Sequence, residues 1–254
     1  MLEKIEYIFQ KNTKNIEFFN LLINLFKDVK YVTNINNEEI HIITSDLKPE
    51  TTFRLDNITS NIQLNIGDKK YLNLLSKQNK DNKELCNIKK LHINDVSHKL
   101  SGHIKRIDHT GINLPTVLFD ELEYKNLLDY LSSNGNVYSY PTGEPWPFLL
   151  PVTEHEHENE ITNFKILREP RFEFVYDKYT DILGIQIDIE TDLSKNEIED
   201  LFPKDQGVYY GGCTFKAIYL DYSENLDIRL DVRYKSTYGD WESGEWLVCE
   251  GKRI

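Results

Sequence analysis

Basic residues are scarce in this sequence of 254 residues. Lys and Arg together number 30 against 42 Asp and Glu, so the formal net charge is −12. No cluster of basic residues offsets this balance. Nucleic acids and anionic membranes both select for basic surfaces. We therefore expect neither as a partner, while a homodimer is compatible with this composition.

Cysteine and long apolar runs are also scarce. The chain has three cysteines, too few and too scattered for a disulfide framework or a zinc motif. Its most apolar stretch, residues 18–26, is interrupted by Asn20 and Asn24 and is far shorter than the ~20 residues of a membrane span. The first residues lack the basic start and uninterrupted apolar run of a signal peptide. We expect a reduced, cytoplasmic protein.

The motifs of several large enzyme classes are absent as well. The sequence contains no G-x-x-x-x-G-K-[ST], no G-x-G-x-x-G after a strand, no G-x-S-x-G, no C-x-x-C and no H-E-x-x-H. Nucleotide-dependent, serine-hydrolase and redox functions thereby lose most of their support.

What is present in the first part of the chain is a pattern of apolar residues. They recur at spacings of three and four over residues 3–30, which predicts a helix there. Strand-like segments follow at 38–46 and 51–66. A polar, irregular stretch at 74–87 is the best candidate for a boundary. We expect an N-terminal α+β module or lobe over 1–95 and a second domain over 100–254.

The second part of the chain has an order of elements that occurs twice. A strand at 103–115 and a helix at 116–135 are followed, after a Pro-rich stretch, by a strand at 170–177. A strand at 182–192 and a helix at 193–203 are followed by three strands, and Ser194 with Glu197 gives this helix a capping box. The pattern favours two βαβββ units, at 103–178 and 183–254. A mixed α+β sheet without internal symmetry is the alternative.

The segment "IDHTGINLP", residues 107–115, followed by a helix, resembles the opening strand of the vicinal oxygen chelate superfamily, which includes glyoxalase I, the bleomycin-resistance proteins and the extradiol dioxygenases. Its members pair two βαβββ modules into a curved sheet that holds the site. For this chain the resemblance implies an α+β, glyoxalase-like fold over 100–254, with an N-terminal α+β extension.

The resemblance also implies a set of metal ligands. Metal-dependent members carry a ligand on the first and last strand of each module, which here gives His109, Glu173, Gln186 and Asp231. One imidazole nitrogen and three oxygens suit a divalent Zn, Ni, Mn or Fe ion. The sequence departs from the family in lacking the turn that commonly precedes the last module strand, and in its Pro-rich insert.

Two functions follow from this resemblance, and both stay open. The first is a cytosolic protein that binds a small molecule in the sheet cup, with metal-dependent lyase, isomerase or dioxygenase chemistry. The second is a metal-free, non-catalytic binding or protein-interaction module. Whether the chain is an enzyme is left undecided by its sequence.

Polar residues alternate with apolar ones in two of the predicted strands. Residues 184–192 and 226–235 each put their apolar residues on one face and their charged or amide residues on the other. If the polar face lines a pocket, Arg229, Arg233 and Asp188 could hold an anionic or hydrogen-bonding ligand. If it faces solvent, it is a cross-strand ladder of ion pairs. We favour the ladder.

Two further segments are candidates for recognition. Residues 138–148 place Tyr140 and Trp146 among prolines, and such rigid aromatic segments either line a ligand pocket or cap the edge of a core. The acidic segment 154–160 contains His155 and His157 and could take up a metal adventitiously. Its lack of hydrophobic residues favours a loop instead.

Overall fold

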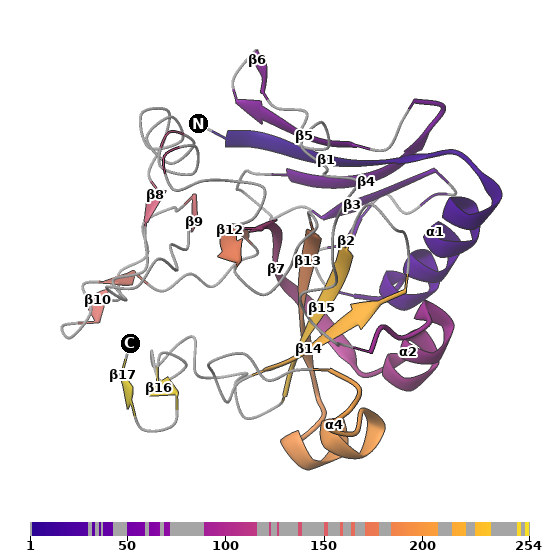
Figure 1. Ribbon diagram of the computed structural model, residues 1–254, viewed down its shortest axis with the longest axis vertical. Coiled ribbons are helices and arrows are strands. Elements are labelled where there is room, and N and C mark those ends of the chain that lie inside the picture. The colour runs from indigo at the N-terminus through magenta and orange to yellow at the C-terminus, as the bar shows by residue number, and fades with distance from the viewer. Residues whose placement is uncertain are drawn as a thin grey trace.

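Two large β-sheets, three helices and three two-stranded hairpins are described in the computed structural model, in an α+β arrangement (Figure 1). The structure describes residues 2–29, 32–33, 36, 38–42, 50–58, 61–66, 69–71, 89–115, 122, 126, 137–138, 150–151, 158–159, 164–165, 171–177, 184–207, 215–221, 227–234, 248–249 and 252–253.

The first sheet has six strands in the order β2-β3-β4-β1-β5-β6. Only β1 and β4 pair in parallel, and the remaining pairs are antiparallel. Its strands are β1 (Leu2–Gln10), β2 (Val32–Thr33), β3 (Glu39–Ile42), β4 (Glu50–Asp56), β5 (Asn61–Ile66) and β6 (Lys69–Tyr71).

The prediction of a helix from residue 3 onward is wrong for the first residues, because 2–10 form strand β1. Tyr7 and Phe9 are buried on one face of this strand, and Ile8 is buried on the other. A strand buried on both faces carries apolar residues without strict alternation, which imitates the spacing of a helix. Helix α1 (Thr13–Phe26) begins after Asn12, whose Oδ1 accepts from the backbone N of Asn15 at 2.9 Å.

The second sheet has five strands in the order β12-β7-β13-β15-β14. The pairs β7–β12 and β13–β15 are parallel, and the pairs β7–β13 and β14–β15 are antiparallel. Its strands are β7 (Ile104–Pro115), β12 (Arg171–Asp177), β13 (Gly184–Thr191), β14 (Phe215–Leu220) and β15 (Asp227–Arg233).

Helix α4 (Lys195–Leu201) lies between β13 and β14, as predicted, and starts with the predicted capping box. The backbone N of Ser194 donates to Glu197 Oε2 at 2.7 Å, and the backbone N of Glu197 donates to Ser194 Oγ at 3.3 Å. Of the helix predicted at 116–135, the structure describes Leu122 and Asn126, both helical. Leu122, which the apolar spacing of the predicted helix puts on its apolar side, is 65% exposed. The boundary predicted at 74–87 lies outside the described residues.

The two sheets share part of their connectivity: a strand, a helix, and a later strand that pairs in parallel with the first. In the first sheet the order β1-α1-β2-β3-β4 ends with β4 parallel to β1, and in the second the order β13-α4-β14-β15 ends with β15 parallel to β13. The complete βαβββ order is therefore found in the first 56 residues, where the sequence did not indicate it because β1 resembles a helix. The domain limits at 1–95 and 100–254 stay a prediction.

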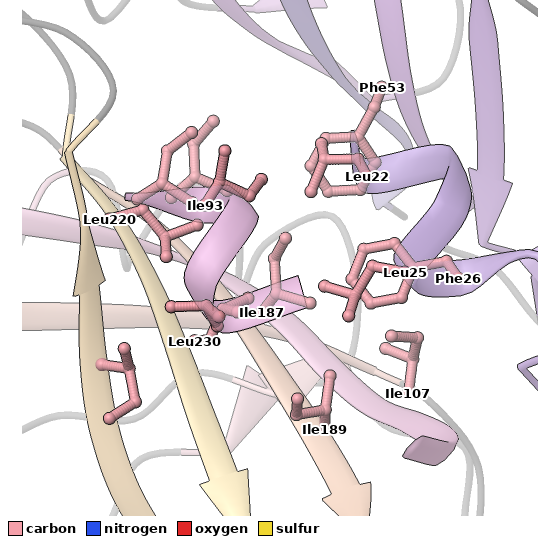
Figure 2. Close-up of a cluster of buried hydrophobic side chains, with 14 of the residues drawn as sticks. Leu22, Leu25, Phe26, Phe53, Ile93, Ile107, Ile187, Ile189, Leu220 and Leu230 are labelled. Carbon is pink, nitrogen blue, oxygen red and sulfur yellow. The ribbon is translucent and has the colours of Figure 1, made fainter. Parts of the chain in front are cut away.

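One hydrophobic core connects the two sheets. Figure 2 shows Leu25 and Phe26 of α1 on the side of Ile107 and Ile189 of the five-stranded sheet, and all four belong to this core. Helix α2 (Ile93–Leu100) packs on α1, and the residue Leu91 before it pairs with Leu220 at the edge of β14. The helices thus cover one face of the five-stranded sheet, which leaves its other face for the polar residues.

Two hydrogen bonds also join the sheets. The hydroxyl of Tyr7 donates to the carbonyl of Gly111 at 2.9 Å, and the hydroxyls of Thr51 and Thr110 lie 2.9 Å apart. Both contacts end on β7, so the first sheet fixes the position of this strand.

Three short hairpins complete the described structure. They pair β8 (Val137–Tyr138) with β9 (Leu150–Pro151), β10 (Glu158–Asn159) with β11 (Phe164–Lys165), and β16 (Val248–Cys249) with β17 (Lys252–Arg253). A search of the described helices finds none with the length and hydropathy needed to cross a membrane.

Candidate functional site

The polar face of the five-stranded sheet is the candidate site, and β13 and β15 form its centre. Along β13, Ile185, Ile187 and Ile189 face the core, as the sequence predicts. Their neighbours face the opposite side. The parallel register then sets these polar residues beside those of β15, in the pairs Gln186 with Arg229, Asp188 with Asp231, and Glu190 with Arg233.

Two guanidinium groups on this face bind carboxylates through two nitrogens each. Arg233 donates from Nε and Nη2 to the two oxygens of Asp188 at 2.6 and 2.8 Å. Arg106, on β7, donates from Nε and Nη2 to the two oxygens of Glu190 at 2.6 and 2.7 Å. Such paired bonds fix the orientation of both groups. The sequence analysis did not identify Arg106, and only the antiparallel register of β7 with β13 places it opposite Glu190.

The third guanidinium on this face binds two partners through one nitrogen. Arg229 Nη2 donates to Gln186 Oε1 and to Asp231 Oδ2, both at 2.7 Å. These two acceptors are two of the four residues proposed as metal ligands. A metal ion bound by Gln186 and Asp231 would therefore compete with Arg229 for the same two oxygens.

This face is buried, which contradicts the expected exposed ladder. The cross-strand pairs do form, but their members are at most 5% exposed: Asp188, Asp231, Glu190, Gln186, Arg229 and Arg233. Removing ionised groups from water costs several kcal/mol for each ion unless its charge is compensated. Each arginine of this face whose side chain the structure describes pairs with a carboxylate, Arg106 with Glu190, Arg229 with Asp231 and Arg233 with Asp188, so these six groups together carry no net charge.

The four proposed ligand positions lie on four strands of the five-stranded sheet, and none of them is the register partner of another. His109 pairs with Asp188 on one side and Arg171 on the other, and Asp188 in turn pairs with Asp231. Glu173 pairs with Gly111, which pairs with Gln186. The four positions thus occupy two neighbouring rows of one sheet. The side chains of His109 and Glu173 lie outside the described part.

The described donor set does not fit a divalent ion in this arrangement. Gln186 and Asp231 each accept a hydrogen bond from the guanidinium of Arg229. A metal ion bound to the same two oxygens would lie next to this positive charge and be repelled by it. Among the side chains that the structure describes, no group of three or more His, Cys, Asp or Glu could hold a metal.

A residue that the sequence analysis missed lies beside this network. Asn113 on β7 is fully buried, and neither its Nδ2 nor its Oδ1 has a hydrogen-bond partner among the described residues. Its position pairs with Gly184 of β13. An asparagine within a strand gives no sequence signal of this kind, because only the tertiary structure shows that its amide is buried.

The other candidates fall into two groups. Tyr140, Trp146, His155 and His157 lie outside the described residues. Two lysines have a structural role: buried Lys216 donates from Nζ to the carbonyls of Phe202 and Pro203, and half-buried Lys99 donates from Nζ to that of Leu201 at 2.6 Å. Burial lowers the pKa of the Lys216 ammonium. These contacts satisfy the carbonyls at the end of α4.

Comparison with known proteins gives little more. No family model matches the chain, and no curated protein matches it. Among solved structures, homoprotocatechuate 2,3-dioxygenase from Arthrobacter globiformis superposes with a TM-score of 0.36 and 10% sequence identity, covering 91% of this chain and 79% of that one. Similarity at this level assigns neither a fold family nor an activity.

Proposed function

We propose that this chain binds a small, neutral, polar molecule against the polar face of the five-stranded sheet, without a divalent metal. The observation that carries the proposal is the buried network of three guanidinium groups and three carboxylates on that face. Ligand sites are commonly buried surfaces with a few polar groups held in fixed positions.

The energetics of the network support a functional role. Well-packed apolar residues in place of a buried ion pair are often equally stable or more stable, so such pairs are weak evidence of a stabilising role. Bidentate bonds hold the groups of this face rigidly, which is what recognition of a polar ligand needs. Because the charges balance within the network, a neutral ligand fits it better than an anion or a cation does.

The architecture supports a paired-module fold of the glyoxalase type. The parallel pairs β7–β12 and β13–β15 meet through the antiparallel pair β7–β13, so two units would share one sheet. In such a fold the ligand binds on the face of the sheet that both units share. In this chain the corresponding surface would be the polar face of the five-stranded sheet.

The metal-dependent alternative rests on His109 and Glu173. Their backbone positions lie in the same two rows of the sheet as those of Gln186 and Asp231, with one strand between Glu173 and Gln186 and one between His109 and Asp231. The contacts of Arg229 favour the metal-free function, because this guanidinium already binds two of the four proposed ligands.

The metal question is tested by metal analysis of the chain purified without an affinity tag. We expect substoichiometric transition metal and an unfolding midpoint that a chelator leaves unchanged. Stoichiometric metal that is lost in His109→Ala would contradict the metal-free function and support the metal-dependent one.

Binding is tested by titrating the intact, ¹⁵N-labelled chain with neutral and charged probes while following the arginine Nε–H resonances by NMR. We expect acetamide and glycerol to shift the resonances of Arg229 and Arg233 in a saturable way, and acetate and methylammonium to leave them in place. Arg54 of the six-stranded sheet, a partly exposed side chain that pairs with Asp56, serves as the internal control. A response to acetate alone, or to none of the probes, would refute a neutral ligand at this face.

A further inference from the structure

We propose that Asn113 is the recognition residue of this site and that it binds a carboxamide group of the ligand. The inference rests on the proposed function, since it names the chemical group that the polar face would take. It goes beyond the arginines and carboxylates by assigning the recognition to a side chain with no charge.

The burial of Asn113 is the first step. Its residue is 0% exposed, and both polar atoms of its amide lack a hydrogen-bond partner in the described part of the chain. Buried polar side chains in native proteins nearly always have partners, so a buried amide without them calls for a specific explanation. A bound molecule that supplies the missing partners is such an explanation.

The position of Asn113 is the second step. It lies two residues after Gly111, whose register partner is Gln186, and its own register partner is Gly184. Because side chains alternate along a strand, Asn113 projects from the same face as Gln186 and the network that contains it. The glycines at 111 and 184 have no side chains to fill the neighbouring positions on this face.

The hydrogen-bonding pattern of the amide gives the ligand class. Asn113 offers a donor, Nδ2, beside an acceptor, Oδ1. A primary carboxamide offers the complementary pair and can satisfy both atoms with two parallel hydrogen bonds. A carboxylate would satisfy only Nδ2 and an ammonium only Oδ1, and each would bring a net charge to a face whose ion pairs are balanced.

The first test follows the side-chain amide of Asn113 by NMR in the intact ¹⁵N-labelled chain. Acetamide is expected to shift this resonance in a saturable way. N,N-dimethylacetamide, which has the same carbonyl but no N–H donor, is the matched probe and is expected to bind at least tenfold more weakly. Equal responses to the two probes, or no response to acetamide, would overturn the assignment.

The second test uses Asn113→Leu, which keeps the approximate shape of the side chain and removes both polar atoms. We expect a higher urea midpoint, because a buried amide without partners is lost, together with at least a tenfold loss of acetamide affinity. Asn15→Leu is the control: its buried amide donates to the carbonyl of Gln10 at 2.6 Å, so this variant is expected to lose stability and keep its response to acetamide.

The outcomes separate the two proposals. Acetamide could shift the Arg229 resonance without shifting that of Asn113, and Asn113→Leu could keep its affinity for acetamide. In that case the assignment to Asn113 fails and the proposed function stands. If no neutral probe shifts either resonance, both fail. Since the NMR titration uses the unmodified chain, it decides the assignment even if Asn113→Leu does not fold.

Discussion

The two sheets of this protein carry polar faces that differ in their exposure to water. In the six-stranded sheet, Arg54 lies 2.9 Å from Asp56 and 4.0 Å from Glu6, and the exposed fractions of these side chains are 30%, 31% and 13%. In the five-stranded sheet, Arg233 and Asp188 form a bidentate pair whose side chains are 6% and 0% exposed. Both faces come from the same alternation of residues along strands.

The difference shows that alternation does not decide what a polar face does. Where water reaches the charges, an ion pair contributes about 0–1 kcal/mol, and its members can be exchanged with little consequence. Where water is excluded, each charge requires its partner, and the geometry is fixed. The buried face is therefore the one in which recognition of a ligand is to be sought.

The largest expected effect comes from breaking a pair on the buried face. Asp188→Ala leaves the guanidinium of Arg233 without the carboxylate that accepts two of its hydrogen bonds. We expect a loss of about 3–5 kcal/mol in the free energy of unfolding, measured by urea denaturation.

The matched change on the other sheet is Asp56→Ala, which removes the 2.9 Å partner of Arg54. Because this pair is partly exposed, we expect a loss of at most about 1 kcal/mol. Similar losses in the two variants would show that the two faces do not differ as the burial of their side chains indicates.

An intermediate effect is expected for the contact between the sheets. Tyr7→Phe removes the hydrogen bond to the carbonyl of Gly111 and should cost about 1 kcal/mol at neutral pH. Burial raises the pKa of the Tyr7 hydroxyl well above its usual value of 10.0.

This shift makes the contribution of Tyr7 depend on pH. The unfolded chain ionises Tyr7 near pH 10 while the folded chain holds the proton, so the contribution is complete below pH 10 and is lost as the pH rises from there toward the folded pKa. Urea denaturation across this range should show a steeper loss in the unaltered protein than in Tyr7→Phe. Parallel pH profiles for the two would count against a buried Tyr7.

The smallest effect is expected at an exposed cluster of three residues where β7 begins and β13 ends. Lys105 Nζ lies 2.6 Å from Asp192 Oδ2, and His103 Nδ1 lies 2.9 Å from Asp192 Oδ1. The bond from Lys105 is the main cause that lowers the pKa of the Asp192 carboxyl below 3.8, so its contribution is present above that pH and is lost as the pH falls.

Because these side chains are about 40% exposed, Asp192→Asn should cost no more than about 0.5 kcal/mol in low salt. The cost should shrink further in 1 M salt, which screens exposed charges. Urea denaturation at two salt concentrations checks this, and a large, salt-independent cost would place Asp192 with the buried groups instead.

Much of the five-stranded sheet could be predicted from the sequence. The strict alternation of Ile185, Ile187 and Ile189 with polar residues gave the strand and its core face, and Ser194 with Glu197 gave the start of α4. Both signals lie within a few consecutive residues, so they can be recognised without knowing which other segments the strand and the helix contact. Strand β1 was not recognised, because a strand covered on both faces has no such alternation.

The candidate site was predictable only in part. The sequence placed Gln186, Asp188, Arg229 and Asp231 on one face, and the structure pairs them across β13 and β15. It gave no means to find Arg106 or Asn113, whose roles depend on the register of β7 against β13. Register between strands far apart in the chain is set by tertiary packing.

By itself, then, the sequence determined which residues of each strand share a face, because the pleat of a strand repeats every two residues. Only the tertiary structure decided that the polar face of the five-stranded sheet is buried, that Arg229 lies between Gln186 and Asp231, and that Asn113 is enclosed with no hydrogen-bond partner for its amide among the described residues. The physical reason is that burial and the pairing of distant charges depend on which segments cover a face, and local patterns contain no information about that covering.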